Sequence, residues 1–165
     1  MNPTTVVELD EGSYMEMETT QIKGVDSTVR VTRATLGPDA TLIIHEKVMT
    51  HGKQLAKSDF TVDLNGEDCH TNVISRSVAR DQSHQVFLAR INGNARCYGH
   101  SECDAIIMDQ GVVAAIPEVT ANCVDASLVH EAAIGKIAGD QLLKLETLGL
   151  TEEEAEDRIL KGFLA

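Results

Sequence analysis

The sequence predicts a mainly β protein that ends in a helical hairpin, and two observations support this. Up to Lys136, apolar residues recur in short runs separated by turn-forming residues such as Gly37-Pro38-Asp39. Runs of this kind are typical of strands. After Lys136 the apolar residues recur at intervals of three or four, the spacing of one helix face. The 165 residues suffice for one domain and a small helical appendage.

The expected strands begin at uneven intervals of roughly 10 to 20 residues, with no helical pattern between them. In the stretch 60–64 apolar and polar side chains alternate, as in a strand with one buried face. Aromatic residues are only 3% of the chain, so Val, Ile, Leu and Ala must fill the core. The expected strands are Val25–Val31, Ala40–Ile44, Phe60–Leu64, Val73–Val78, Val86–Ile91, Ala105–Met108, Val112–Ile116 and Ser127–Val129.

Periodicity alone leaves three β architectures open: a sandwich, a barrel and a β-solenoid. Asn65-Gly66 and Asn92-Gly93 are each compatible with a tight hairpin turn, which would join antiparallel strands. The same residues also favour the left-handed corners of a β-helix. No strict internal repeat is visible in the sequence, which weighs against a regular solenoid.

Two amphipathic helices are expected within residues 138–165. In the first, Leu142, Leu145 and Leu148 share one face and Gly149 marks the end. The second begins at a capping box, Thr151-Glu152-Glu153-Glu154, in which the first and last side chains each bind the other's backbone N–H. The apolar faces of this hairpin require a cover, either the β-domain or another protein.

The first 24 residues interleave acidic and apolar side chains, which is compatible with an edge strand, an ordered arm or a solvated acidic lead-in. The expected organisation is therefore an acidic segment over residues 1–24, a β core over 25–137 and the helices over 138–165.

The charge balance excludes several functions. The formal net charge is −12, with 26 acidic and 14 basic residues and no basic run, which disfavours nucleic acids and anionic membranes. No apolar stretch approaches the roughly 20 residues that cross a bilayer, and the N-terminus lacks signal-peptide features. A cytoplasmic location is expected. The four cysteines form no C-x-x-C pair, so they are expected to be free thiols or soft-metal ligands.

Several ordered blocks carry a family resemblance, strongly over the last seventy or so residues and more weakly back to about residue 25. They are Asn94-Ala95-Arg96, the stretch 102–109, Ile116-Pro117-Glu118-Val119, the stretch 129–137, Gly139-Asp140-Gln141-Leu142 and the stretch 149–163. These blocks resemble the C-terminal part of the SufB/SufD family of iron–sulfur cluster assembly proteins. The resemblance implies a right-handed parallel β-helix that carries C-terminal helices.

The resemblance also implies a function without catalysis. In that family two scaffold subunits join edge to edge, either as two copies or as paralogues, and hold cluster precursors. Their C-terminal helices dock an ABC-type ATPase, SufC. No P-loop is present in this chain, so ATP hydrolysis is expected in the partner, and the expected cargo is a transient iron–sulfur cluster or iron. The residues expected to contact the ATPase are Asp140, Gln141, Leu142, Leu145, Ala155, Ile159 and Phe163.

His130-Glu131 aligns with a His-Glu pair that SufB-type members carry near the subunit interface. Imidazole and carboxylate are both suitable iron ligands, but adjacent residues of a regular strand point to opposite faces. The cysteines expected from SufB-type and SufD-type members are replaced here by Gly111 and Leu128. Thiolate is the usual ligand of a cluster, so the remaining candidates are Cys103, Cys97 and Cys123.

Two departures shape the alternatives. The chain is shorter than full SufB or SufD proteins, so an exposed end coil is expected to be covered in a dimer. Loss of the expected cysteines also leaves open a divergent structural subunit without cluster chemistry. A β-solenoid enzyme is a further alternative, although no spaced carboxylate pair stands out. The other histidines, including His100, are expected to be exposed or singly hydrogen-bonded.

Overall fold

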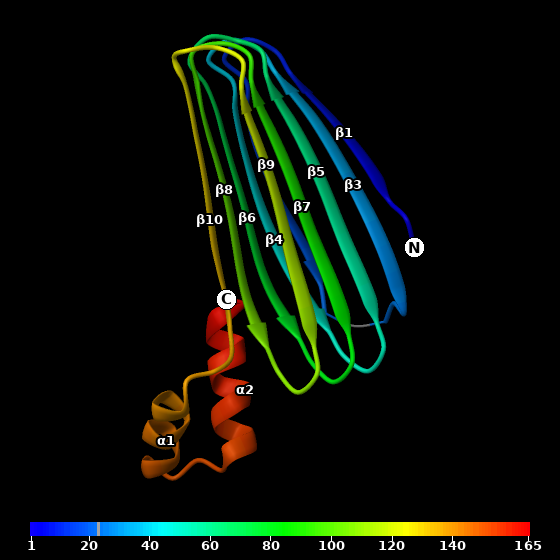
Figure 1. Ribbon diagram of the computed structural model, residues 1–165, viewed down its shortest axis with the longest axis vertical. Helices are drawn as coiled ribbons and strands as arrows, with labels where there is room; N and C mark the ends of the chain where they lie inside the picture. Colours follow the sequence, from blue (N-terminus) through cyan, green and yellow to red (C-terminus); the bar gives the residue numbers. More distant parts are fainter. Residues whose placement is uncertain (23) are drawn as a thin grey trace.

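The computed structural model describes residues 1–22 and 24–165 and contains ten strands followed by two helices (Figure 1). The elements are β1 (Thr4–Leu9), β2 (Tyr14–Gln21), β3 (Ser27–Leu36), β4 (Thr41–Thr50), β5 (Leu55–Leu64), β6 (Cys69–Ala79), β7 (His84–Gly93), β8 (Cys97–Ile107), β9 (Val112–Ala121), β10 (Ala126–Gly135), α1 (Gly139–Thr147) and α2 (Glu152–Phe163).

The strands form a parallel β-solenoid of about five turns. Odd-numbered strands build one sheet in the order β1-β3-β5-β7-β9, and even-numbered strands build the other, β10-β8-β6-β4-β2. From β3 onward, each strand pairs in parallel with the strand one turn earlier, as His84 does with Leu55 and Val112 with His84. The predicted parallel β-helix with C-terminal helices is confirmed, and Asn65-Gly66 and Asn92-Gly93 do not form hairpins.

The solenoid is more regular than the uneven strand spacing led us to expect. From β2 onward, successive strands begin at nearly equal intervals along the chain. At one end of the solenoid, Gly24, Gly52, Asp81 and Asp109 all adopt positive φ, one residue in each successive turn. The left-handed backbone conformation favours Gly most, followed by Asp and Asn. The turns therefore repeat the same backbone conformation at this corner, although the residue at the corner differs from turn to turn.

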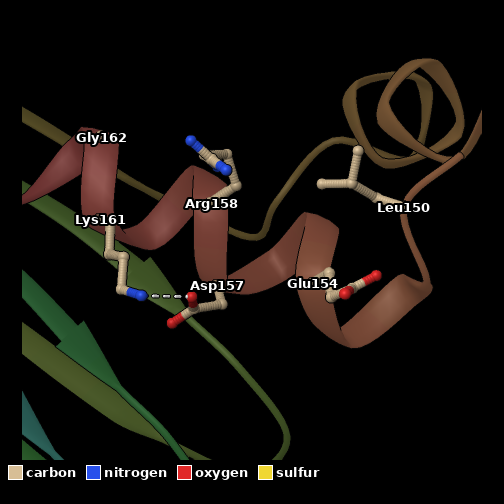
Figure 2. Close-up of a pocket in the computed structure, with 6 residues that line it drawn as sticks. All are labelled: Leu150, Glu154, Asp157, Arg158, Lys161 and Gly162. Atoms are coloured by element: carbon tan, nitrogen blue, oxygen red, sulfur yellow. Dashed lines mark ion pairs between the residues drawn. The ribbon is translucent and has the colours of Figure 1, made fainter. Parts of the chain in front are cut away.

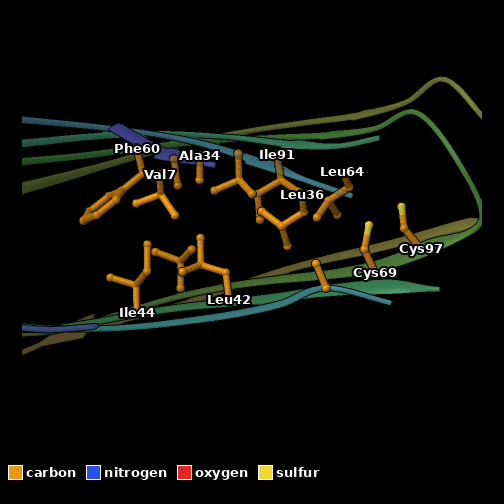
Figure 3. Packing of buried hydrophobic residues seen from close by; sticks show 14 of the residues in the cluster. Val7, Ala34, Leu36, Leu42, Ile44, Phe60, Leu64, Cys69, Ile91 and Cys97 are labelled. Carbon is orange, nitrogen blue, oxygen red and sulfur yellow. The ribbon is translucent and has the colours of Figure 1, made fainter. Parts of the chain in front are cut away.

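The core lies between the inner faces of the two sheets. Figure 3 shows side chains from both sheets meeting there, among them the fully buried Leu36, Leu42 and Ile44. Phe60 and Phe87 pack against each other from neighbouring strands, with ring centroids 5.7 Å apart and the ring planes tilted by 49°. Inward side chains alternate with outward ones along each strand. Most of the inward side chains in the core cluster are aliphatic, as predicted.

One buried carboxylate connects the two sheets inside the solenoid. Glu46 on β4 is 2% exposed and accepts hydrogen bonds from Arg30 Nη1 at 2.9 Å, Ser58 Oγ at 2.5 Å and Ser75 Oγ at 3.0 Å. Arg30 and Ser58 come from the opposite sheet. A buried ion is tolerated only when it is paired and hydrogen-bonded, and Glu46 meets both conditions.

The acidic N-terminal segment belongs to the solenoid. β1 pairs with β3 and β2 pairs with β4, so residues 4–21 form the first turn and the solenoid begins at Thr4 rather than near residue 25. Its glutamates face outward from β2, where Glu18 lies 3.2 Å from Lys47. Of the three possibilities for this segment, strand formation is the one that the structure shows.

The two predicted helices are present, with α2 beginning at the predicted capping box. Thr151 Oγ1 accepts from the backbone N–H of Glu154, and Glu154 Oε2 accepts from the backbone N–H of Thr151 at 2.8 Å. In Figure 1 the helices lie beyond one end of the sheets, and the last residues return towards β10. Neither helix has the length or apolar character needed to cross a bilayer, among the residues described.

Close stacking of consecutive corners makes a prediction about Gly66. A Cβ added there would overlap the backbone of Gly37 and Pro38 in the preceding turn. Gly66→Ala should therefore lower the free energy of unfolding in urea by about 3 kcal/mol or more, the upper range for overpacking. Gly135→Ala, where a Cβ meets nothing within 4 Å, is the matched control and should stay within about 0.5 kcal/mol. Equal effects of the two substitutions would contradict this account of the corners.

Candidate functional site

The structure separates the five predicted ligand candidates into three places. Cys97 and Cys123 lie at the corner where the chain passes from the odd-stranded to the even-stranded sheet. Cys103 and His130 point into the solenoid from β8 and β10. Glu131 points outward from β10. The five side chains therefore do not form one cluster.

The corner holds three thiols, of which Cys123 is half-buried and the other two are buried. Cys69 and Cys97 occupy paired positions on β6 and β8, and Figure 3 shows them side by side at the edge of the core. Burial, followed by the nearby Cys97, raises the pKa of Cys69 to about 11, and burial also raises the pKa of Cys97. Cys69 and Cys97 are therefore protonated at neutral pH and behave as small core residues.

The inner site places His130 and Cys103 on the inward faces of two paired strands, β10 and β8. His130 pairs in register with Ser101, and Cys103 is the next inward residue of β8. Burial first, and then the charge of His100, lower the pKa of His130, so its imidazole is neutral at pH 7. Among the described residues, the buried His130 Nδ1 and Ser101 Oγ have no hydrogen-bond partner. Burial and the nearby Glu46 raise the pKa of Cys103 to about 12.

The outer face of the same strands gathers three ligating side chains. His100 and Glu102 of β8 and Glu131 of β10 each place one ligand atom within 4.8 Å of the others. Glu131 is directly opposite Glu102 in the register, and its Oε2 lies 3.4 Å from His100 Nε2. The expectation that His130 and Glu131 would face opposite sides is confirmed.

Polar neighbours orient this outer group. His100 Nδ1 lies 2.8 Å from Asn72 Oδ1, so the ring is held with Nε2 towards Glu131. Burial, followed by a hydrogen bond to Asp104 and by the charge of Asp104, raises the pKa of Glu102. The nearby charges of His100 and Arg76 act in the opposite direction. The sequence analysis missed His100 and Glu102, because strand register alone brings them to Glu131.

The two positions that lack the expected cysteines have structural roles. A Cβ on Gly111 would lie 2.5 Å from the carbonyl oxygen of Ala79, so this corner has no room for a side chain. Leu128 points inward and packs over Gly99 and the core cluster. Neither position presents a ligand.

The helical residues predicted to contact a partner differ in exposure. Asp140 and Gln141 are exposed, while Leu142, Leu145, Ile159 and Phe163 are half-buried and Ala155 is fully buried. The apolar side chains most open to solvent on the hairpin are Leu143 and Leu148, 60% and 71% exposed, which the prediction did not include as contacts.

A pocket of about 570 Å³ lies along α2 (Figure 2). Leu150 from the loop before the helix and Gly162 contribute to its wall, together with four charged side chains: Glu154, Asp157, Arg158 and Lys161. Lys161 Nζ is 2.6 Å from Asp157. A wall that carries charges of both signs and only one leucine is more typical of a protein-docking surface than of a small-molecule pocket.

The fold and the outer group define a parallel β-solenoid that has side chains able to ligate a metal ion on its last two turns, and a helical appendage. Residues 3–163 match the family model described as SUF system FeS cluster assembly, SufBD core domain. The chain therefore belongs to the SufBD family.

Individual relatives agree with this membership. A SufBD family iron–sulfur cluster assembly protein of Methanocaldococcus jannaschii is 33% identical over 99% of this chain and 52% of its own length. One from Archaeoglobus fulgidus is 29% identical over 99% of this chain and 45% of its own length. One from Methanothermobacter thermautotrophicus is 35% identical over 63% of this chain and 26% of its own length. The chain spans about half the length, or less, of these relatives.

The burial of the thiols predicts their reactivity. At pH 8 a thiol with a pKa near 12 is ionised to only about one part in ten thousand, so native Cys103 should resist iodoacetamide. Cys123, the half-exposed thiol, should be alkylated first, as followed by mass spectrometry of digested samples. In urea all four should react at similar rates. Native labelling of Cys103 as fast as Cys123 would contradict the buried placement.

Proposed function

We propose that this chain is a scaffold subunit for iron–sulfur cluster assembly. The observation that carries the proposal is the SufBD core match over residues 3–163, together with ligating side chains on the last two strands of the even-stranded sheet. The chain itself is not an enzyme in this proposal. It holds iron or a nascent cluster as transient cargo, and its four free cysteines suit the reducing cytoplasm.

The proposed energy source is a SufC-type ABC ATPase that docks on the helical hairpin. Leu143 and Leu148 supply exposed apolar anchors, and Asp140 and Gln141 supply polar contacts beside them. An interface of this kind combines an apolar centre with a polar rim. Leu142, Leu145 and Ala155 are less exposed than these anchors, so their proposed contribution is to the packing of the hairpin.

The last turn supports the proposed second subunit, either another copy or a paralogue. β9 and β10 are the last strands of their sheets, so one backbone edge of each lacks a strand among the described residues. Val112, Ile116 and Val119 on β9 and Val129 on β10 are between 37% and 46% exposed. Unpaired edges with exposed apolar side chains favour edge-to-edge association.

The docking proposal is tested on the exposed leucines. Leu143→Asp or Leu148→Asp should reduce capture of a purified SufC-type ATPase by about tenfold or more, because a buried aspartate at an interface is costly. Val124→Asp, at a 96% exposed apolar position on the far corner, is the matched control and should not change capture. Removal of residues 138–165 should abolish capture. Undiminished capture by the truncated chain would refute docking on the helices.

A second candidate function is a structural subunit that has lost cluster chemistry. It is favoured by Gly111 and Leu128, which offer no thiolate, and by the burial of Cys103. Under this alternative the chain would support a paralogous subunit and dock the ATPase without binding cargo.

Anaerobic reconstitution distinguishes these two functions. With the ATPase, Fe²⁺ and sulfide, a scaffold should develop the visible absorption of a bound cluster. His130→Ala should lower the yield severalfold, because an inward-facing neutral imidazole that could ligate iron is lost. His51→Ala, at an exposed corner, is the control. A chain that docks the ATPase but never develops this absorption is the structural subunit.

A further inference from the structure

We propose that His100, Glu102 and Glu131 bind a single divalent first-row transition-metal ion, of which Fe²⁺ and Mn²⁺ are the best fit. The site lies on the outer face of the even-stranded sheet and uses one imidazole nitrogen and two carboxylate oxygens. It is separate from the inward thiols and from His130. Binding of this ion requires neither ATPase docking nor cluster formation.

The backbone register builds the site. β8 and β10 pair in parallel with Glu102 opposite Glu131. His100 lies two residues before Glu102 and points outward on the same face of β8. The three ligand atoms already lie within 4.8 Å of one another. Two oxygens bound to one ion at about 2.1 Å are at most about 4.2 Å apart, so small rotations of the side chains suffice. Both strands are regular, which keeps the group in place.

The histidine is oriented in the way that metal ligands usually are. Its Nδ1 lies 2.8 Å from Asn72 Oδ1 on β6, so Nδ1 is the donor in this contact and Nε2 is the ring nitrogen that remains for a metal ion. Asn72 is opposite His100 in the register. Nε2 is the ring nitrogen turned towards Glu131, 3.4 Å from its Oε2, so an ion placed between the two side chains would contact both atoms.

The charge balance around the group favours a cation. Glu102, Asp104 and Glu131 place three carboxyl groups on neighbouring outward positions of β8 and β10, and Arg76 faces Asp104 from β6. Among these register neighbours, three carboxyl groups face one guanidinium, so acidic groups are in excess where a divalent ion would bind.

The donor set and its position indicate the class of ion. Carboxylates favour hard cations, while imidazole favours iron, zinc and similar ions, so a mixed site suits Fe²⁺ or Mn²⁺. Three protein ligands leave positions open for water or cargo. Glu131 is 65% exposed in its side chain and lies on the last strand of its sheet, so the ion can enter from solvent.

The corner thiols cannot complete this site. Cys97 precedes Glu102 by five residues of extended strand, a separation of about 16 Å at roughly 3.3 Å per residue. Cys103 is adjacent to Glu102 but points to the opposite face. An ion held here is therefore bound by nitrogen and oxygen alone, and this distinguishes it from a thiolate-bound cluster.

The experiment uses the full chain without ATPase or sulfide and measures Mn²⁺ binding by the loss of the free-ion EPR signal. Mn²⁺ is chosen because thiols bind it poorly. The chain should bind one Mn²⁺ at a site that Glu131→Gln, Glu102→Gln and His100→Ala each weaken by about tenfold or more. Asn72→Ala, which removes only the orienting contact, should weaken binding by about 10- to 100-fold. Competition with Fe²⁺ under anaerobic conditions should displace the Mn²⁺.

The controls separate a specific site from the general acidity of the chain. Glu8→Gln removes the same charge from an exposed position on the opposite sheet and should leave binding unchanged, as should Cys123→Ser. Glu131→Gln is the decisive variant, because its exposed side chain is not needed for folding. Equal binding by Glu131→Gln and Glu8→Gln would overturn the proposal and would leave only an ion pair between His100 and Glu131. That failure would not affect ATPase capture, which tests the proposed function independently.

Discussion

The structure depends on the parallel backbone pairing of each turn with the next, at a nearly constant offset along the chain. The inner strands of this solenoid satisfy their N–H and C=O groups by pairing with the turn before and the turn after. The same offset stacks like positions, as in the chain of hydrogen bonds from Asn122 to Asn94 and from Asn94 to Asn65, both at 2.7 Å. Side-chain neighbours are therefore set by register rather than by proximity in sequence.

This constraint divides the chemistry of the last turns between two environments. Odd-numbered residues of β8 point inward and even-numbered ones outward, and in β10 the parity is reversed. His130 consequently shares the interior with Ser101 and Cys103, where burial keeps the Cys103 thiol protonated and the imidazole neutral. Glu131 shares the outer face with His100 and Glu102, where carboxylates remain in reach of water. One sheet thus separates a soft-ligand interior from a hard-ligand surface.

Much of the fold was predictable from local patterns, and the missed parts have physical reasons. All eight expected strands exist, because turn residues and apolar alternation such as that of residues 60–64 are local signals. β1 and β2 were left undecided because outward glutamates on β2 resemble a solvated segment. The repeat was not visible because Gly52, Asp81 and Asp109 share a positive φ but not an identity. The architecture itself came from the family resemblance, since periodicity did not choose between solenoid, sandwich and barrel.

The candidate site could also be predicted only in part from the sequence. Its location depends on β10 being the last strand of its sheet. Glu131 was found through resemblance, whereas His100 and Glu102 belong to the preceding turn and meet it only through the pairing of β8 with β10. In the inner turns an outward side chain has a strand on either side, as Lys47 does between β2 and β6. β10 has such a neighbour on one side only, within the described residues. Its outward ligands therefore face both β8 and open solvent, so the last turn is where an ion, a cargo or a second subunit reaches side chains that the register has already aligned.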